Sequence, residues 1–315
     1  MEYAIEVSGM RKYYKEIKAV DNISFQVEKG ELFGFLGING AGKSTTINVL
    51  CTLLPWEVQS GSARVCGHIL GKEDEKIRRK IGVVWQNNCL DKKLTVKENL
   101  YVRGSLYEQG KEQLRENVDR VCEKLGLSDI LERRYEHLSG GQKRRCEIAA
   151  ALVNTPEVLF LDEPTTGLDP ATRKSVWSSL EEMREKEGVT IFLTTHYMEE
   201  AAQANHIAII DSGQIRETGS PFALKERFAK DKLKLIPKPG RAEELECILR
   251  RQRSRNEEYI GSAVWKEGFF TLSLFESLSA LPILKEAEEC LRGFELVQGS
   301  MDDVFLNITG KTLEK

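Results

Sequence analysis

One stretch near the N-terminus combines glycines, a lysine and hydroxyl side chains at a spacing that suits phosphate binding. The sequence GINGAGKSTT, Gly37 to Thr46, fits the pattern G-x-x-x-x-G-K-[ST]. Glycines let consecutive backbone N–H groups turn inward around a phosphate without a clash from Cβ. Lys43 would bridge the β- and γ-phosphates of a nucleotide, and the Ser44 hydroxyl would hold Mg²⁺. A turn that binds nothing is the alternative, but an apolar run precedes this stretch and a helical one follows it, which favours phosphate binding.

Two adjacent carboxylates close a second apolar run. Asp162 and Glu163 directly follow residues 158–161, Val-Leu-Phe-Leu. In phosphoryl-transfer sites the first such carboxylate belongs to the shell of Mg²⁺, and a second one beside it can orient and deprotonate a water molecule. Adjacent acids at the tip of a strand are also common as solvated loop residues. The phosphate-binding stretch upstream makes the catalytic interpretation the favoured one.

A histidine and a glutamine follow two further apolar runs in the same manner. His196 closes residues 191–195, and Gln86 follows residues 81–85. Taken singly, a structural histidine and a surface glutamine are the usual interpretations. In open α/β sheets, however, ligands bind at the carboxyl ends of the strands. Four polar groups at such ends therefore predict one site.

A second glycine pair lies about a hundred residues downstream, in LSGGQKRR, Leu138 to Arg145. A serine hydroxyl and backbone N–H groups at the start of a helix can bind an anion. A Ser-Gly-Gly turn that only caps the helix is the alternative, which we set aside because the other motifs occur in order. The basic clusters at 78–80, 143–145 and 250–255 lie beside acidic residues, and we interpret each as a solvated helix face.

The elements that must position these groups alternate between apolar runs and helical stretches over residues 1 to about 220. The runs 32–36, 81–84, 158–161, 189–193 and 207–210 are typical of strands in a mostly parallel sheet covered on both faces. We expect a helix at about 44–54 and a helical insertion at about 92–137. The fold class is therefore α/β.

The C-terminal part has a different pattern. Residues 230–240 contain two prolines and indicate a domain boundary. Beyond it, the pattern predicts a β-α-β-β-α-β order, which is typical of a ferredoxin-like domain. The expected elements after a first strand are a helix at 242–251, two strands within 259–275 around Lys266-Glu267-Gly268, a helix at 281–291, a strand at 294–297 and a helix at 302–308.

Composition excludes several classes of protein. The chain has 315 residues, of which 41% are hydrophobic and 30% charged, and a net charge of −3, so we expect two globular domains and no nucleic-acid partner. Its seven cysteines form no C-x-x-C pair, which argues against a zinc or disulfide framework. No signal peptide is evident, and no uncharged apolar run approaches the roughly 18 residues of a membrane span. A cytosolic protein anchored at a membrane only through another subunit fits these features.

The order of the motifs resembles the nucleotide-binding subunit of an ATP-binding-cassette (ABC) transporter. The order is 37–44, Gln86, Leu138–Gln142, 161–164, 166–169 and His196, and the intact Leu-Ser-Gly-Gly-Gln is close to diagnostic. The ending SMDDVFLNITGK, Ser300 to Lys311, resembles the C-terminal extension of the drug-resistance (daunorubicin-type) branch, whose ATPases serve ABC-2-type export permeases. The resemblance implies a P-loop NTPase domain at 1–225, with a helical subdomain at about 87–150, and an accessory α+β domain at 231–315.

The resemblance also implies a binding site for ATP and Mg²⁺. Tyr14 matches the aromatic residue that stacks on adenine, although Tyr13 is adjacent. His196 would contact the γ-phosphate, and Gln86 would touch Mg²⁺ or the attacking water. The remaining residues expected to contact the nucleotide are Gly37, Asn39, Gly40, Gly42, Lys43, Ser44, Thr45, Ser139, Gly140, Gly141, Gln142 and Asp169.

The acidic residues and the assembly follow from the same resemblance. Asp162 would hold Mg²⁺ through water, Glu163 would be the general base, and Asp169 would shape a dimer interface. In this family the signature loop 138–142 of one subunit caps the γ-phosphate bound to another. That implies a head-to-tail homodimer with two competent sites, with a heterodimer as the alternative.

Integral-membrane permease subunits are the implied partners, on the inner face of the cell membrane. We expect them to dock at about 87–105 through Leu90, Leu94, Leu100 and Tyr101, with core packing as the alternative role of these residues. The C-terminal domain would stabilise the dimer or restrain nucleotide access. The alternatives to export are an ABC importer, a non-transport ABC ATPase and a small-molecule kinase. A single phosphate-binding loop and the absence of a heptad tract argue against the second, and the signature and His196 against the third.

Overall fold

The computed structural model describes residues 2–107, 110–255, 261 and 263–311, and it divides into two compact units, Met1–Pro221 and Phe222–Lys315. The strands of the first unit are β1 (Tyr3–Tyr14), β2 (Ile17–Glu28), β3 (Leu32–Leu36), β4 (Ser62–Val65), β5 (His68–Ile69), β6 (Ile81–Val84), β7 (Val158–Asp162), β8 (Thr190–Thr195), β9 (His206–Asp211) and β10 (Gln214–Gly219). Its α-helices are α1 (Lys43–Leu50), α2 (Asp74–Lys80), α3 (Val96–Gly104), α4 (Lys111–Lys124), α5 (Gly140–Leu152), α6 (Pro170–Glu187) and α7 (Met198–Ala201).

The centre of the first unit is a six-stranded sheet in the order β10-β9-β3-β8-β7-β6, parallel except for the β9–β10 pair. Every residue of β3, β7 and β8 is buried. This confirms the sheet expected from the apolar runs, because strands covered on both faces need apolar residues at successive positions. The helix expected at 44–54 is shorter than predicted, since α1 ends at Leu50 and a turn follows.

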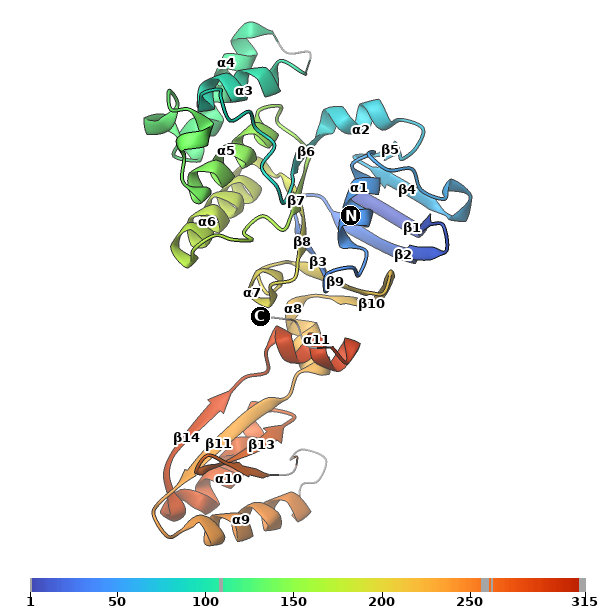
Figure 1. Cartoon of the computed structure of the whole chain (residues 1–315). Helices are drawn as coiled ribbons and strands as arrows, with labels where there is room; N and C mark the ends of the chain where they lie inside the picture. The colour runs from blue at the N-terminus through green and yellow to red at the C-terminus, as the bar shows by residue number, and fades with distance from the viewer. Residues whose placement is uncertain (1, 108–109, 256–260, 262, 312–315) are drawn as a thin grey trace. The chain divides into compact units, whose positions relative to one another are not determined.

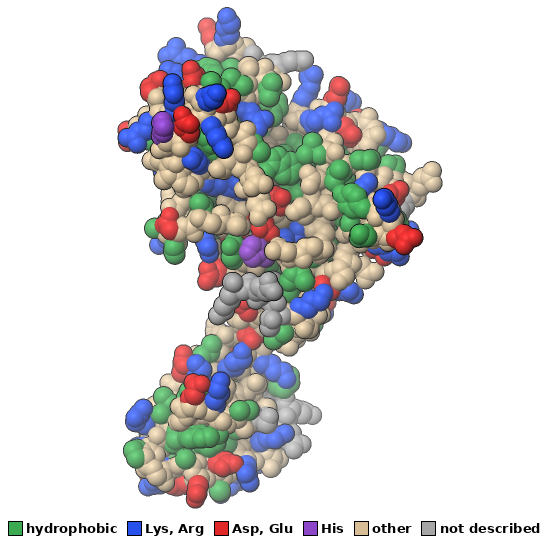
Figure 2. All heavy atoms as spheres, viewed as in Figure 1, with side chains coloured by type: hydrophobic (Ala, Val, Ile, Leu, Met, Phe, Trp, Pro, Cys, Tyr) green, Lys and Arg blue, Asp and Glu red, His purple; other side chains and the backbone are tan. Residues whose placement is uncertain are grey.

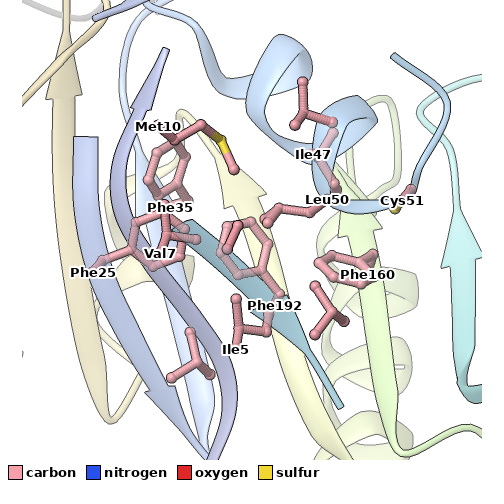
Figure 3. Close-up of a cluster of buried hydrophobic side chains, with 14 of the residues drawn as sticks. Ile5, Val7, Met10, Phe25, Phe35, Ile47, Leu50, Cys51, Phe160 and Phe192 are labelled. Atoms are coloured by element: carbon pink, nitrogen blue, oxygen red, sulfur yellow. The ribbon is translucent and has the colours of Figure 1, made fainter. Parts of the chain in front are cut away.

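A second, antiparallel sheet covers α1 and one face of the central sheet. Its order is β2-β1-β4-β5, and Figure 1 shows α1 beside it. In Figure 3, Ile47 and Leu50 of α1 point into the same cluster as Phe25 of β2 and Phe192 of β8. The Phe25 and Phe192 rings lie 5.9 Å apart. Both sheets therefore share one core, and α1 is fixed between them.

Helices α3 to α6 lie on the other side of the central sheet (Figure 1). Between residues 92 and 137 the described residues form helical segments and one isolated β-bridge, Thr95 to Arg134, so the helical insertion is confirmed. Two residues expected to dock a partner, Leu90 and Leu100, are instead buried, at 7% and 0% exposed. For these two the core-packing alternative is correct, and Leu100 lies on α3, which packs against α5.

The second unit contains α8 (Pro221–Phe228), β11 (Asp231–Pro237), α9 (Ala242–Arg255), β12 (Val264–Lys266), β13 (Phe269–Leu274), α10 (Ala280–Ala287), β14 (Leu291–Val297) and α11 (Met301–Thr309). Its antiparallel sheet has the order β12-β13-β11-β14, and the elements after α8 run β-α-β-β-α-β as predicted. Glu267 and Gly268 both have positive φ in the β12–β13 turn, which is the signature of a type I′ hairpin.

One prediction for this unit is wrong. The prolines at 230–240 do not mark a boundary, because β11 occupies Asp231–Pro237 in the middle of the sheet and the units divide at Pro221. The helix predicted at 281–291 is confirmed apart from its last residue. α10 ends at Ala287, a 3-10 turn follows over Glu288–Cys290, and Leu291 begins β14 by pairing with Pro237. The start of the predicted strand region, Tyr259, lies outside the described residues.

Charges on the surface are mixed, and no helix of the described residues is long and apolar enough to cross a bilayer. Figure 2 shows basic and acidic side chains interspersed over the visible face of each unit. Such a surface offers no extended basic stripe on this face for a polyanion.

A matched pair of leucines tests the shared core. Leu50 is fully buried beneath the phosphate-binding stretch, whereas Leu106 is 69% exposed. We expect Leu50→Ala to lower the free energy of unfolding by about 2–5 kcal/mol, because it leaves a cavity, and Leu106→Ala to change it by less than about 0.5 kcal/mol. Urea denaturation of both variants measures the difference, and equal effects would contradict this description of the core.

Candidate active site

The stretch from Gly37 to Thr46 wraps around the start of α1. Gly42 has φ +111°, and a Cβ there would lie 2.5 Å from the Ala19 carbonyl oxygen, so glycine is required. The N-terminus of α1 has no side-chain cap, whereas α3, α5 and α6 are capped by their own Thr95, Ser139 and Asp169. The first N–H groups of α1 are therefore open to an anion.

A hollow opens at this helix end. It is lined by Ala19, Ile38, Asn39, Gly40, Gly42, Lys43, Ser44, Thr45, Gln86 and Glu163. Six predicted nucleotide contacts and two predicted catalytic residues thus share one cavity. Gly37 lies behind it, where its carbonyl oxygen accepts a hydrogen bond of 2.7 Å from Lys43 Nζ.

Glu163 is the point at which the separate motifs meet. Its Oε1 lies 3.4 Å from Lys43 Nζ and 3.1 Å from His196 Nδ1. Its Oε2 accepts a hydrogen bond of 3.2 Å from Gln86 Nε2. The structure therefore brings Gln86, Glu163 and His196 together with the lysine of the phosphate-binding stretch.

The backbone of Glu163 is strained. Its φ is +46°, in the left-handed region that a residue with a Cβ rarely adopts. The turn is held by its N–H, which donates to the Thr194 carbonyl oxygen at 3.1 Å. Such strain costs on the order of 1–3 kcal/mol and is concentrated at functional sites.

His196 Nδ1 has an unusual environment. It is buried, and although it lies 3.1 Å from Glu163 Oε1, it has no hydrogen bond to any described residue. A buried nitrogen without a partner is costly. His196 does not line the hollow, so its predicted contact with the γ-phosphate stays a prediction.

Burial sets the electrostatics of the other charged groups. Burial raises the pKa of the Asp162 carboxyl, against the opposing effect of Thr194, whose hydroxyl donates to Asp162 Oδ1 at 2.5 Å. Burial likewise lowers the pKa of Lys43, although the attraction of Glu163 opposes the shift. Both ionised groups are therefore destabilised in the fold, as expected where ligand charge is needed to balance them.

The two tyrosines at the end of β1 are distinguished by their partners. The Tyr13 hydroxyl donates to Asp21 Oδ1 at 2.9 Å, so this ring is fixed within the β1–β2 hairpin. Tyr14 is 42% exposed, and Lys12 Nζ lies 5.3 Å from its ring centroid. Tyr14 therefore keeps a free aromatic face, which favours the residue predicted to stack on adenine.

The signature residues lie elsewhere in the unit. Ser139 caps α5 and forms a capping box with Gln142, while its predicted contact with the nucleotide of another subunit stays a prediction. A Cβ on Gly141 would lie 2.2 Å from Thr172 Cγ2 at the start of α6. Asp169 caps α6 by accepting from Thr172 N at 3.0 Å. Ser139, Gly140, Gly141, Gln142 and Asp169 thus belong to the start of α5 and α6 and do not line the hollow.

The interpretation of residues 143–145 as a solvated face is wrong for Arg144. Its side chain is 4% exposed and donates to the carbonyl oxygens of Trp85, Asp162 and Pro164. Glu147, one turn further along α5, is 6% exposed and also buried against the segment after Gln86. Sequence reasoning missed both residues. The only signal was their spacing of three, which places them on one face of α5.

Comparisons with known proteins identify the family of the chain. A profile of the ABC transporter family matches residues 20–166. The chain is 38% identical over 314 residues to the daunorubicin/doxorubicin resistance ATP-binding protein DrrA of Streptomyces peucetius, covering 98% of this chain and 92% of the relative. It is 33% identical to the linearmycin resistance ATP-binding protein LnrL of Bacillus subtilis, with 98% and 99% covered.

Solved structures give the same result. The first unit resembles the ATP-binding cassette MJ0796, solved as a dimer bound to ADP and Pi, with a TM-score of 0.62 and 28% identity over 69% of this chain and 98% of that one. An ATP-binding subunit of an ABC transporter matches with a TM-score of 0.64 and 25% identity, covering 71% of this chain and 93% of that one. The chain belongs to the ATP-binding proteins of the ABC transporter family, and its enzymatic class is that of an ATPase.

Asp162→Asn tests the burial of negative charge. The variant keeps an oxygen that accepts from Thr194 and removes a carboxylate whose pKa burial raises. A raised folded pKa means that ionisation costs stability above the unfolded value of 3.8. We therefore expect the variant to be more stable at pH 7 by about 0.5–2 kcal/mol.

The difference in unfolding free energy between Asp162→Asn and the wild type must depend on pH. It should shrink as pH falls through the raised pKa and disappear below 3.8, where the wild-type carboxyl is protonated in both states. Denaturant titrations at several pH values measure it. Asp129→Asn, at an exposed position, is the control and should show no stabilisation at pH 7. A destabilised Asp162→Asn protein at pH 7 would refute the argument.

Proposed function

We propose that this chain is the ATP-hydrolysing subunit of an ABC exporter that moves a drug, lipid or other amphiphile. The observation that carries the proposal is the convergence of Lys43, Gln86 and His196 on the Glu163 carboxylate. Relatives over the whole chain include resistance ATP-binding proteins, for daunorubicin/doxorubicin and for linearmycin. They support export over import, while the cargo itself would be bound by a separate membrane subunit.

The proposed mechanism assigns each group to an atom of the reaction. Lys43 and the open N–H groups of α1 bind the β- and γ-phosphates. Glu163 accepts the proton of the attacking water, Gln86 orients that water, and His196 Nδ1 contacts the γ-phosphate. When ATP binds, the lysine ammonium exchanges its contact with Glu163 for phosphate oxygens. That exchange frees a carboxylate oxygen for the water.

The residues present fit a magnesium ion. Ser44, Gln86 and Glu163 line one hollow, and Asp162 precedes Glu163, so hydroxyl, amide and carboxylate oxygens are available. These are the hard oxygen donors that Mg²⁺ prefers, and the ion keeps several waters. We propose that Ser44, Gln86 and Asp162 hold it, the last through water. The ion when bound neutralises charge on the phosphates.

Two chains would complete the site. Ser139, Gly140 and Gly141 do not line the hollow in which Lys43 lies. They would reach the γ-phosphate of a second chain in a head-to-tail homodimer, with a heterodimer as the alternative. We propose further that residues 1–225 are the ATPase domain and that 231–315 are an accessory domain that stabilises this dimer or restrains nucleotide access.

We propose that the permease docks in a groove between the central sheet and the helical layer. The groove is lined by Leu53, Arg78, Trp85, Arg103 and Glu147 among others. Figure 2 shows hydrophobic side chains gathered between the helices α3–α5 and α2. Apolar and charged walls together suit an amphipathic cytoplasmic helix of an integral-membrane partner. The groove replaces Leu90 and Leu100 as the docking surface.

Glu163→Gln tests the catalytic assignment. The amide cannot accept the proton of water, so we expect the turnover number to fall by about 10²–10⁴-fold. The affinity for ATP should stay within about threefold of wild type, because the phosphate-binding stretch is unchanged. Steady-state hydrolysis and nucleotide titration measure the two. Glu157→Gln, on the surface beside Lys80, is the control and should hydrolyse normally. Near-normal turnover in Glu163→Gln would remove Glu163 as the base.

Leu53→Glu tests the groove. This side chain lines the groove and is 56% exposed, so the substitution should leave the fold intact while replacing an apolar contact with a carboxylate in the interface. In a Glu163→Gln background with ATP, affinity purification from native membranes followed by mass spectrometry should recover a multi-spanning protein. Leu53→Glu should reduce that recovery by about tenfold or more.

The matched control is Leu278→Glu, 71% exposed in the second unit, which should leave recovery unchanged. If the Glu163→Gln protein with native Leu53 and Leu278 recovered only soluble partners, the exporter proposal would be contradicted. Equal recovery with Leu53→Glu would contradict the groove alone.

A further inference from the structure

Arg144 makes three hydrogen bonds that join α5 to the loops of the active site. Its Nη1 donates to the Trp85 carbonyl oxygen at 2.5 Å, and Trp85 directly precedes Gln86. Its Nη2 donates to the Asp162 carbonyl oxygen at 3.4 Å, and its Nε donates to that of Pro164. These two carbonyls lie on either side of Glu163. One guanidinium therefore holds the backbone next to both predicted water-binding groups.

Glu147 holds the same loop from its other end. Its Oε1 accepts from Cys89 N at 2.8 Å and from Leu90 N at 3.1 Å. The Tyr135 hydroxyl donates to the same oxygen at 2.7 Å. Gln86 thus lies on a loop that is held before it by Arg144 and after it by Glu147, both from one face of α5.

From these contacts we infer that Arg144 and Glu147 form a clamp that fixes Gln86 and Glu163 relative to the signature helix α5. We call these two side chains the α5 clamp. They are positioning residues, since neither lines the hollow beside Lys43. The inference rests on the proposed function, because it assumes that Gln86 and Glu163 act on water.

Buried charge is costly enough to need an explanation. Apolar residues of similar volume often stabilise a core as well as a buried ion pair does. Here Arg144 donates to backbone carbonyl groups of the loops, and Glu147 accepts from backbone N–H groups. Burial lowers the pKa of Arg144 to about 10. Guanidinium and carboxylate groups impose direction on their partners, which packing alone does not. The clamp therefore specifies where the loops lie.

The clamp also reaches the groove proposed for the permease. Glu147, Trp85 and Cys89 all line it. A helix seated there would press on the loop that Glu147 and Arg144 hold. Movement of α5 against the sheet would then displace Gln86 and the turn at Glu163 together, which offers a direct path from the partner to hydrolysis.

The first test separates catalysis from nucleotide binding in the full-length protein. We expect Arg144→Met and Glu147→Leu to lower kcat by about 10- to 100-fold, since misplaced groups lose catalysis steeply. KM for ATP should change by less than about twofold, because the phosphate-binding stretch is untouched. Arg145→Met is the matched control, since Arg145 donates to the Leu125 and Gly126 carbonyls, and none of these residues lines the hollow. Its kcat should stay within about twofold.

Conservative variants keep the test valid if an apolar variant fails to fold. Glu147→Gln retains an oxygen that accepts from Cys89 and Leu90, and should keep kcat within about threefold of wild type. Arg144→Lys retains the charge but cannot span three carbonyls, and should lose at least about tenfold. Thermal unfolding is followed for every variant. An equal loss of kcat in Glu147→Gln and Arg144→Lys would overturn the inference that Arg144 and Glu147 form a clamp.

A double-mutant cycle shows whether Glu147 acts through Gln86. Single-turnover rates are compared for Glu147→Leu in the wild-type and Gln86→Ala backgrounds, or for Glu147→Gln if the leucine variant is unfolded. We expect the Glu147 substitution to lower the single-turnover rate less in the Gln86→Ala background, by about fivefold or more, because the glutamine that it positions is then absent. Equal losses in both backgrounds would overturn the inference. The proposed function would still stand if wild type hydrolyses ATP and Glu163→Gln does not.

Discussion

The structure depends on one carboxylate held at the edge of a parallel sheet. Glu163 lies within 3.4 Å of Lys43 and His196 and accepts from Gln86, although these residues are far apart in the chain. Each arrives there because β3, β6, β7 and β8 run in the same direction and end at the same edge. Packing of the surrounding core must keep those strand ends in fixed positions. That requirement explains why β3, β7 and β8 are buried along their full length.

The energetics of this edge oppose stability and favour ligand binding. Burial destabilises the ionised forms of Lys43 and Asp162, and Glu163 has a left-handed backbone. None of these features helps the chain to fold, so the core and the caps of α5 and α6 must compensate. A magnesium nucleotide would bring phosphate charge to the lysine and a cation to the carboxylates. The protein is therefore arranged so that its least favourable charges are balanced by its proposed substrate.

Local sequence was sufficient to predict the strands and the residues at their ends, because runs of apolar residues indicate buried strands directly. It was insufficient where a tertiary partner decides. Three adjacent basic residues look alike at 143–145, and only the carbonyls facing α5 turn Arg144 inward. In the same way, the helix predicted to reach Leu291 extends one residue too far, because Leu291 pairs with Pro237 and begins β14. The roles of the catalytic residues depend on ligand contacts, so they remain proposals.

The two helix ends that could bind phosphate differ in a way that bears on assembly. The start of α1 has no side-chain cap, whereas the start of α5 is satisfied by Ser139 and Gln142. An uncapped end attracts an anion by itself, but a capped end can exchange its hydroxyl contact only when a phosphate is brought to it already bound. In one chain the capped end does not line the hollow and packs on α6. A second subunit is the natural means of bringing that phosphate, so hydrolysis would depend on how two chains approach each other, and a permease could control it by moving them.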